Sequence, residues 1–297
     1  MDVGLVGLGR MGGNMATRRV RGGHRVVGFD PSPTARQAAQ TSGIEAAGSL
    51  RDLVTALPPP RAVWIMVPAG EPTEIALREL AELLAPGDTI IEGGNTYYKD
   101  DVRRAPALIA RGLHYVDAGV SGGIWGLTEG FCLMVGGARD VVQRLAPIFT
   151  TLAPPDGWLH VGAVGSGHYV KMIHNGIEYG LMQPYAEGFE LMSASDYGLD
   201  LPAVARLWNR GSVVRSWLLE LTAGALSNDP KLAALKAWVE DSGEGRWTIA
   251  DAVEKAVPAP VITAALYARL RSRRENSFAD RLLAALRNAF GGHAVRR

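Results

Sequence analysis

Asp2-Val-Gly-Leu-Val-Gly7-Leu-Gly9-Arg-Met-Gly12-Gly-Asn-Met-Ala16, at the start of the chain, is the stretch that decides the fold. A short apolar run is followed at once by a Gly-x-Gly-x-x-Gly pattern and then by an amphipathic segment. In a strand–turn–helix, the first glycine allows the tight turn, the second lets a pyrophosphate approach the backbone, and the third lets helix and strand pack closely. Free N–H groups at the helix N-terminus then favour the anion. The stretch predicts a dinucleotide site that is formed by Gly7, Leu8, Gly9, Arg10, Met11 and Gly12.

A carboxylate closes the second apolar run, residues 25–29, and bears on the choice of cofactor. Asp30 can accept hydrogen bonds from the ribose hydroxyls of an adenosine, and it would repel a 2′-phosphate. Arg36, a few residues later, is either a cation that binds such a phosphate or a helix-surface side chain. We therefore predict NAD as the cofactor, with NADP less favoured.

Strand and helix patterns alternate through the first half of the chain. This alternation predicts an α/β domain with a Rossmann-type, doubly wound parallel sheet. After about Gly165 the strand signals vanish, and Pro184 is expected to kink the first of the helices that follow. We divide the chain into an NAD-binding Rossmann domain, residues 1–164, and an all-α C-terminal domain, residues 165–297. The expected strands are 2–6, 25–30, 62–67, 88–92, 114–119 and 131–136, and the expected C-terminal helices are 166–197, 201–210, 212–224, 230–239, 249–256, 260–274 and 278–290.

Composition narrows the class of protein. The 297 residues are 47% hydrophobic and carry a formal net charge of +1, which gives no reason to expect a nucleic-acid or membrane partner. The single cysteine, Cys132, lies in an apolar strand pattern and is expected to be buried. No histidine spacing is typical of a metal site, and no targeting or membrane-spanning segment is recognised. A cytoplasmic protein without a metal is the expectation.

A polar stripe is predicted on the helix that follows Gly165-Ser-Gly-His-Tyr-Val. Lys171, Asn175 and Glu178 are spaced i, i+4 and i+7, so one helix face presents all three. An amine, an amide and a carboxylate on one stripe can serve as a base, a positioning group and an acid. The alternative is an exposed charge pair with a cap. Apolar flanks and the dinucleotide motif favour the catalytic interpretation.

Three loops leave the carboxyl ends of predicted parallel strands, which is where open α/β sheets bind ligands. Val67-Pro68 is expected to lie against the nicotinamide half of the cofactor. The glycines of Gly93-Gly94-Asn95 and Ser121-Gly122-Gly123 either expose N–H groups that can hold a carboxylate or simply make turns.

Together these motifs resemble the 6-phosphogluconate dehydrogenase family, within the β-hydroxyacid dehydrogenase superfamily. The resemblance covers most of the chain and is most specific in Gly167-His-Tyr-Val-Lys-Met-Ile-His-Asn-Gly-Ile-Glu-Tyr-Gly180. The Gly7–Ala16, Gly93–Thr96 and Val120–Gly123 segments and the Phe290–His293 tail add to it. The chain is shorter than the common form and is similar to a short bacterial branch that is often NAD-linked.

The resemblance implies a role for each site residue. Lys171 would be the general base and Glu178 the general acid, with His174 and Asn175 on the substrate hydroxyls. The remaining substrate contacts that it implies are Ser121, Gly122 and Gly123 for the carboxylate, Asn95 beside both cofactor and substrate, Tyr179, Arg269 and Arg287 for the phosphate, and His293. In the family, Arg287 and His293 reach the site of a neighbouring subunit. This implies a homo-oligomer, either a dimer or a tetramer, whose helical domain serves substrate binding and oligomerisation.

The implied reaction is the oxidative decarboxylation of 6-phosphogluconate to ribulose 5-phosphate and CO₂ with NAD, in pentose phosphate or gluconate metabolism. One segment departs from the family pattern. The family's Lys-Gly-Thr-Gly loop is here Asp241-Ser-Gly-Glu-Gly-Arg-Trp247, with Ser242 in the place of the phosphate-binding lysine and Arg246 as the candidate substitute. Two alternatives stay open. One is a dehydrogenase of a small 3-hydroxy acid such as 3-hydroxyisobutyrate, and the other is a non-catalytic nucleotide-binding sensor.

Overall fold

The computed structural model describes residues 1–291 and residue 294. The chain forms two compact units, Met1–His174 and Asn175–Arg297. The first unit holds all eight strands of the sheet, and the described part of the second is helical.

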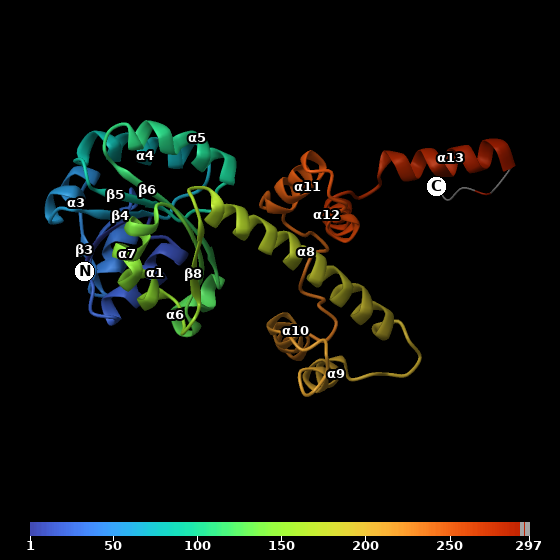
Figure 1. Ribbon diagram of the computed structural model, residues 1–297. Helices are drawn as coiled ribbons and strands as arrows, with labels where there is room; N and C mark the ends of the chain where they lie inside the picture. Colours follow the sequence, from blue (N-terminus) through green and yellow to red (C-terminus); the bar gives the residue numbers. More distant parts are fainter. Residues whose placement is uncertain (292–293, 295–297) are drawn as a thin grey trace. The chain divides into compact units, whose positions relative to one another are not determined.

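The sheet of the first unit has the order β3-β2-β1-β4-β5-β6-β7-β8 (Figure 1). Its strands pair in parallel except for β6 and β7, which are antiparallel. The predicted Rossmann-type α/β fold is therefore confirmed, with one antiparallel pair in a mostly parallel sheet. The strands are β1 Asp2–Val6, β2 Arg25–Phe29, β3 Glu45–Ala46, β4 Ala62–Ile65, β5 Thr89–Glu92, β6 His114–Ser121, β7 Cys132–Gly136 and β8 Trp158–Gly162.

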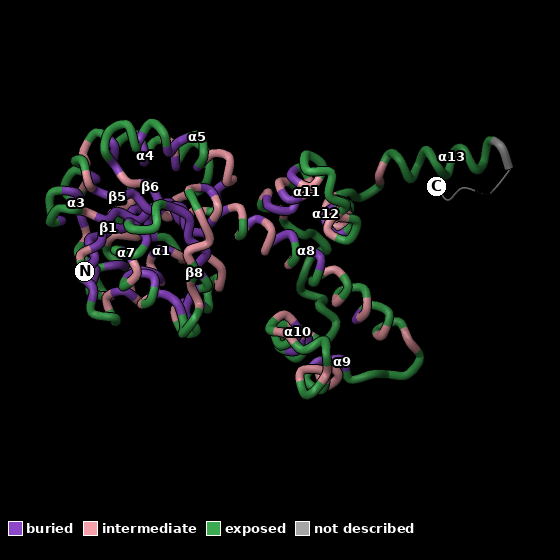
Figure 2. The backbone as a smooth tube through the Cα atoms, in the orientation of Figure 1, coloured by how far each residue is buried: buried purple, intermediate pink, exposed green. Residues whose placement is uncertain are grey.

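Helices cover both faces of this sheet, so its central strands are buried on both sides and read as continuous apolar runs. Val3 and Leu5 pack with α1 and α7 in one core, and Val63 and Ile65 pack with α3, α4 and α5 in the other. Figure 2 shows this buried centre of the first unit. The helices are α1 Arg10–Arg21, α2 Pro33–Gln40, α3 Leu50–Ala56, α4 Glu71–Leu83, α5 Tyr98–Ile109, α6 Gly126–Glu129 and α7 Arg139–Leu152, with a 3₁₀ turn at Gly123–Trp125.

The sequence expectations for this unit missed both edge strands, β3 and β8, and were wrong about Cys132. The strand β8 was not predicted, because it lies at the edge of the sheet and most of its residues are only half-buried. Cys132 was expected to be buried, but it is exposed. It is the first residue of β7 and pairs with Ser121 at the last residue of β6, where the two strands reach the rim of the sheet.

The second unit contains two small helical clusters along α8. Phe189 packs with α9 and α10, while Tyr179 packs with α11 and α12. No helix within residues 1–291 combines the length and the apolar character that crossing a membrane requires. The helices are α8 Ser166–Ser193, which begins in the first unit, and α9 Leu201–Trp208, α10 Trp217–Asn228, α11 Glu244–Glu254, α12 Pro260–Ser272 and α13 Phe278–Gly291.

The helix expected at residues 230–239 is absent from the described structure, which has turns there. The carboxylate of Asp229 accepts hydrogen bonds from the backbone N–H groups of Lys231 and Ala234 at 3.3 and 3.1 Å. Such side-chain bonds to nearby N–H groups compete with helix formation. The helix α11 begins at Glu244 rather than at 249, directly after Gly243, whose φ is 107°. The helix α8 continues through Pro184 to Ser193.

Candidate active site

Each glycine of the first turn is surrounded differently, and the surroundings explain why a glycine is found there. Gly7 has a φ of 95°, and a Cβ there would lie 2.4 Å from the carbonyl oxygen of Met66. A Cβ on Gly12 would lie 1.9 Å from the carbonyl oxygen of Gly7. A Cβ on Gly9 would meet no atom within 4 Å, so this position is open. Gly7 and Gly12 thus shape the turn, whereas Gly9 leaves free space at the start of α1.

The N-terminus of α1 is suited to an anion. Its N-cap is Gly9, no side chain caps it, and its first turn contains no acidic residue. The backbone N–H groups of Arg10, Met11 and Gly12 therefore stay available at the positive end of the helix dipole. This arrangement fits the pyrophosphate of a dinucleotide.

Asp30 stands beside this turn, at the end of β2. Its Oδ2 accepts a hydrogen bond from the N–H of Leu8 at 2.8 Å, and its Oδ1 accepts one from the N–H of Ser32 at 2.8 Å. Arg36 donates from Nη1 to the carbonyl oxygens of Asp30 and Pro31, at 2.6 and 3.2 Å. The guanidinium of Arg36 is thus bound to the backbone of the turn, and the carboxylate of Asp30 is fixed against the glycine loop.

The loops after β4 and β5 adjoin the glycine turn. The position of a Cβ on Gly7 lies 3.2 Å from Cγ1 of Val67, and that of a Cβ on Gly94 lies 2.8 Å from the carbonyl oxygen of Val67. The structure therefore brings Val67 together with the glycine turn and with the Gly93-Gly94 loop. Pro68 and Asn95, which follow in these two loops, are exposed.

Lys171 lies in the first turns of α8, where the helix passes close to two strands. A Cβ on Gly119 of β6 would lie 2.4 Å from Cβ of Lys171, and one on Gly167 would lie 2.5 Å from the carbonyl oxygen of Met134 in β7. Only glycine at these positions allows so close an approach. The half-buried Lys171 is thereby held against the end of β6.

The Ser121-Gly122-Gly123 loop continues from the end of β6. Both glycines have positive φ values, 122° and 52°. The Ser121 Oγ lies 3.5 Å from Nε2 of His174, at the outer limit of a hydrogen bond. The structure thus places two predicted substrate contacts, Ser121 and His174, side by side.

A buried polar cluster beneath these loops escaped the sequence analysis. His168 Nδ1 lies 2.7 Å from Oδ2 of Asp101 and 3.7 Å from Oε2 of Glu92. The Asp117 carboxylate accepts hydrogen bonds from the N–H groups of Gly165 and His168 at 2.7 and 2.9 Å, so it caps the start of α8. Glu92 accepts from the N–H of Gly94 at 2.8 Å. The cluster therefore holds both the helix of Lys171 and the loop of Asn95.

The charges of this cluster depend on each other. Burial alone would lower the pKa of His168, but the carboxylates of Asp101, Glu92 and Asp117 outweigh it and raise the pKa to about 10. Burial raises the pKa of Glu92 and of Asp117. Asp117 and Glu92, each an acidic residue in an apolar strand pattern, were sequence signals that could have pointed to the cluster.

In the second unit, Asn175 is joined to α11. Its Nδ2 donates to Oε1 of Glu244 at 2.6 Å, and both side chains are buried. Glu244 was not predicted as a site residue. A Cβ on Gly176 would lie 2.8 Å from Cγ2 of Thr248, so α8 and α11 approach each other closely there.

Tyr179 and Arg269, both predicted to contact the phosphate, are in direct contact. The guanidinium of Arg269 lies 3.4 Å from the centre of the Tyr179 ring, a cation–π arrangement. Arg269 Nη1 also donates to the carbonyl oxygen of Glu240 at 2.9 Å. The N–H of Ser242 points to the Tyr179 hydroxyl oxygen at 3.4 Å.

The remaining predicted residues lie on α8 and α13 or outside the described residues. Glu178 is half-buried on α8, and Arg287 is exposed on α13. His293 lies outside the described residues. Arg246, the candidate substitute for the missing lysine, donates from Nε to Oδ2 of Asp241 at 2.5 Å.

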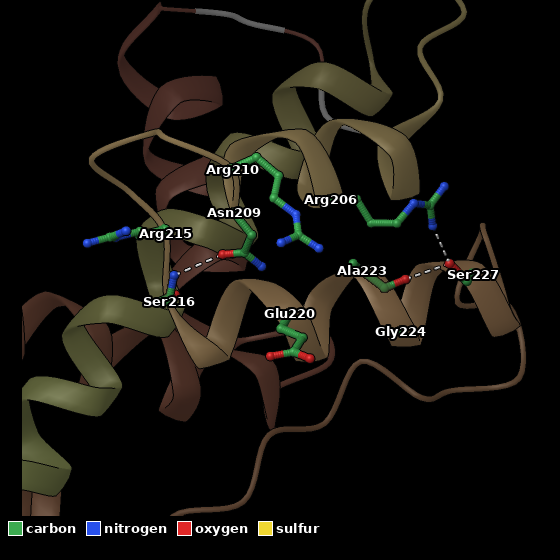
Figure 3. A pocket seen from close by; sticks show the side chains of 9 residues that line it. All are labelled: Arg206, Asn209, Arg210, Arg215, Ser216, Glu220, Ala223, Gly224 and Ser227. Atoms are coloured by element: carbon green, nitrogen blue, oxygen red, sulfur yellow. Dashed lines mark hydrogen bonds between the residues drawn. The ribbon is translucent and has the colours of Figure 1, made fainter.

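A separate pocket of about 690 Å³ lies at α9 and α10 (Figure 3). Arg206, Arg210 and Arg215 line it, and Arg206 donates to Oγ of Ser227 at 3.0 Å. Its lining contains no residue that the sequence analysis assigned to the site.

Two family models match the chain in succession. The NAD binding domain of 6-phosphogluconate dehydrogenase matches residues 2–165, and the 6-phosphogluconate dehydrogenase C-terminal domain matches residues 167–282.

Two similar proteins with the same name differ in length. A protein of Haloferax volcanii named 6-phosphogluconate dehydrogenase, NAD(+)-dependent, decarboxylating is 45% identical over 299 residues, which cover 100% of this chain and 99% of that protein. A Bacillus subtilis protein of the same name is 34% identical, covering 94% of this chain and 63% of its own length.

Among solved structures, a 6-phosphogluconate dehydrogenase of Plasmodium falciparum, described with its cofactor NADP+ and its substrate 6-phosphogluconate, superposes with a TM-score of 0.85 at 28% identity. The superposition covers 100% of this chain and 66% of that one, so the chain spans about two thirds of the longer relatives. The succession of both family domains, together with identity along the full length of a relative of the same size, shows that this chain belongs to the 6-phosphogluconate dehydrogenase family.

Proposed function

We propose that this chain is an NAD-dependent, decarboxylating 6-phosphogluconate dehydrogenase that forms ribulose 5-phosphate and CO₂. The observation that carries this proposal is the stripe of α8. Lys171, Asn175 and Glu178 follow one another at i, i+4 and i+7 on an unbroken helix, so an amine, an amide and a carboxylate share one face. This stripe occurs in a chain that matches an NAD(+)-dependent, decarboxylating relative over its whole length.

The first unit supports NAD as the cofactor. The open space at Gly9 and the uncapped N-terminus of α1 suit the pyrophosphate, and Asp30 at the end of β2 suits the ribose hydroxyls. Nη1 of Arg36 is engaged by the carbonyl oxygens of Asp30 and Pro31, that is, by the backbone of the turn. Val67, Pro68 and Asn95 are proposed to border the nicotinamide half.

The first chemical step needs a base at the 3-hydroxyl of the substrate. Neutral Lys171 would take the hydroxyl proton, and NAD, when bound at the glycine turn, would supply the acceptor for the hydride on carbon 3. Carbon 3 becomes a ketone and Lys171 becomes an ammonium ion. Lysine is charged in water at neutral pH, so this role requires the neutral form of Lys171.

The ketone then makes loss of the carboxylate easy. The bond between carbons 1 and 2 breaks, CO₂ leaves, and the electron pair moves to the carbonyl oxygen, which the Lys171 ammonium stabilises. Glu178 next gives a proton to the carbon that lost CO₂, which is carbon 1 of the product. Each well-placed proton transfer is worth about 10²–10⁴-fold in rate.

The other predicted residues are proposed to bind the substrate. Ser121, Gly122 and Gly123 would hold the carboxylate, and His174 and Asn175 the hydroxyls. The stacked pair of Tyr179 and Arg269 supports a phosphate contact, since Arg269 presents a fixed guanidinium. Arg287 and His293 are proposed to complete the site.

We propose that Arg287 and His293 act on the site of a neighbouring subunit in a homo-oligomer. The apolar side chains Phe278, Leu282, Leu283 and Leu286 of α13 are exposed, which supports a protein partner for this helix. The proposed functional boundary remains between residues 164 and 165. The proposed location is the cytoplasm, supported by the single cysteine.

Absorbance of the reduced nicotinamide, measured with 6-phosphogluconate and either NAD or NADP, tests this function. We expect strong turnover with NAD and weak turnover with NADP. Turnover with NADP alone would keep the reaction and overturn the assignment of Asp30. Turnover only of unphosphorylated 3-hydroxy acids would favour a 3-hydroxyisobutyrate-type enzyme, and NAD binding without turnover of any sugar acid would favour a nucleotide sensor.

A further inference from the structure

Glu244 is a buried carboxylate at the first position of α11, and only 3% of its surface is exposed. Removing a carboxylate from water is costly unless hydrogen bonds replace the lost hydration. Its Oε1 accepts one from Nδ2 of Asn175 at 2.6 Å. Its Oε2 is equally buried and has no hydrogen-bond partner among the described residues. One of the two acceptor oxygens of Glu244, the unmet oxygen Oε2, therefore still lacks a hydrogen-bond donor within the described part of the chain.

Two guanidinium groups in this part of the second unit already have other partners. Arg246, two residues along α11, is paired with Asp241. Arg269 stacks on Tyr179 and donates to the backbone of Glu240. Since both guanidinium groups have other partners, Oε2 of Glu244 has no donor among the described residues and is open to a donor from a bound substrate.

The backbone around Glu244 fixes its position. A Cβ on Gly245 would lie 2.7 Å from Cε2 of Tyr179, so the first turn of α11 lies directly on that ring. The same helix meets α8 at Gly176 and Thr248, where a Cβ would be 2.8 Å from the threonine. Glu244 is thereby fixed beside Asn175, and its neighbour Gly245 lies on Tyr179. Asn175 and Tyr179 are both proposed to contact the substrate.

The chemistry of the unmet oxygen decides which part of the substrate it can bind. A phosphate dianion offers only acceptor oxygens and would be repelled by a carboxylate, whereas a hydroxyl can donate. In the Lys-Gly-Thr-Gly pattern of the family loop, Glu244 occupies the place of the threonine. This chain thus carries a charged acceptor where the longer form carries a neutral hydroxyl.

We propose that Glu244 determines specificity for the sugar-acid chain: one carboxylate oxygen orients the Asn175 amide, and the other accepts a hydrogen bond from a substrate hydroxyl. The inference rests on the proposed function. According to this proposal, residues of α8 and α11 recognise the hydroxyl groups of the substrate as well as its phosphate.

The test is a double-mutant cycle between one side chain and one hydroxyl. We would measure kcat/KM of the full-length protein with NAD for 6-phosphogluconate and for its 2-, 4- and 5-deoxy analogues, in the wild type and in Glu244→Gln. A hydrogen bond to a charged group is worth about 1.5–3 kcal/mol, or roughly 10- to 100-fold. We expect one analogue to lose about that factor in the wild type and only a few-fold in Glu244→Gln.

Glu254→Gln, at the exposed end of the same helix, is the matched control and should retain the wild-type pattern. Equal losses for all analogues in wild type and Glu244→Gln would show a merely structural role. If Glu244→Gln does not fold, Glu244→Asp takes its place. This variant retains the charge but withdraws the carboxylate by one methylene, and its losses with the analogues are compared with those of the wild type in the same way. In the wild type alone, losses below about threefold for every analogue would overturn the proposal. Absence of any turnover of 6-phosphogluconate by the wild type would instead overturn the proposed function.

Discussion

His168 and Asp101 form a hydrogen bond of 2.7 Å between Nδ1 and Oδ2, inside the first unit, where both side chains are buried. The backbone N–H of His168 is bound by Asp117, and its ring also faces Glu92. His168 precedes Lys171 by one helical turn. A charged imidazole thus joins the start of α8 to α5 and to the end of β5, so the position of the proposed base depends on a buried ion pair.

Replacing this imidazole should be costly to the fold. We expect His168→Asn to lower the free energy of unfolding by about 3–5 kcal/mol, because it leaves the buried carboxylates without their cation. Urea denaturation of both proteins at neutral pH would measure the difference. His114→Asn, at the half-buried start of β6, is the control and should cost much less. Equal losses in the two variants would contradict a charged His168.

The stability that His168 contributes should depend on pH in a defined direction. Its pKa is raised to about 10 in the folded protein, against about 6.5 in an unfolded chain. The contribution is therefore fully present below about pH 6.5 and is lost as the pH rises through about 10. The pKa values of Glu92 and Asp117 are raised as well. For an acid, a raised pKa means that the folded protein disfavours the charged carboxylate, so these two shifts do not add to the stability that the His168 charge contributes. We expect the stability difference between wild type and His168→Asn, from urea curves between pH 6 and 10.5, to shrink as the pH rises. A difference that stays constant would rule out this protonation.

Two glycines of the dinucleotide turn should respond differently to the same substitution. Gly12→Ala places a Cβ against the backbone of the turn, so we expect a lower free energy of unfolding. Gly9→Ala meets no protein atom and has a φ of −61°, so its stability should stay within about 0.5 kcal/mol of the wild type. Its methyl group would occupy the space proposed for the pyrophosphate, and we expect NAD affinity to fall at least about tenfold. Calorimetric titration with NAD and urea denaturation separate the two effects. Unchanged NAD affinity in Gly9→Ala would place the pyrophosphate elsewhere.

The parts of the fold that the sequence predicted are those whose signals are local. The strands β1, β4 and β5 are covered on both faces, so each is a continuous buried run that ends at a turn. The half-exposed edge strand β8 lacks such a run and was missed. The helix predicted at 230–239 was wrong, because apolar spacing does not reveal that the Asp229 carboxylate binds the neighbouring N–H groups.

The candidate site divides in the same way. The glycine turn, Asp30 and the stripe of α8 follow from spacings within one element or one strand–helix unit. The partners of His168 and Asn175 do not, because Asp101 and Glu244 lie 67 and 69 positions away in the sequence. Pairings over such distances arise only when strands and helices have packed, and no spacing rule contains them.

The proposed base gives the most direct prediction for catalysis. Lys171→Met retains much of the side chain's length and removes the amine, so we expect kcat with 6-phosphogluconate and NAD to fall by at least about 10²–10⁴-fold. NAD binding, measured by calorimetric titration, should remain within a few-fold of the wild type, because the glycine turn and Asp30 belong to other elements of the sheet. Lys231→Met, at an exposed position, is the matched control and should keep full activity. Wild-type turnover by Lys171→Met would remove Lys171 from the role of base. Loss of both turnover and NAD binding would instead mean that Lys171 holds the structure of the cofactor site.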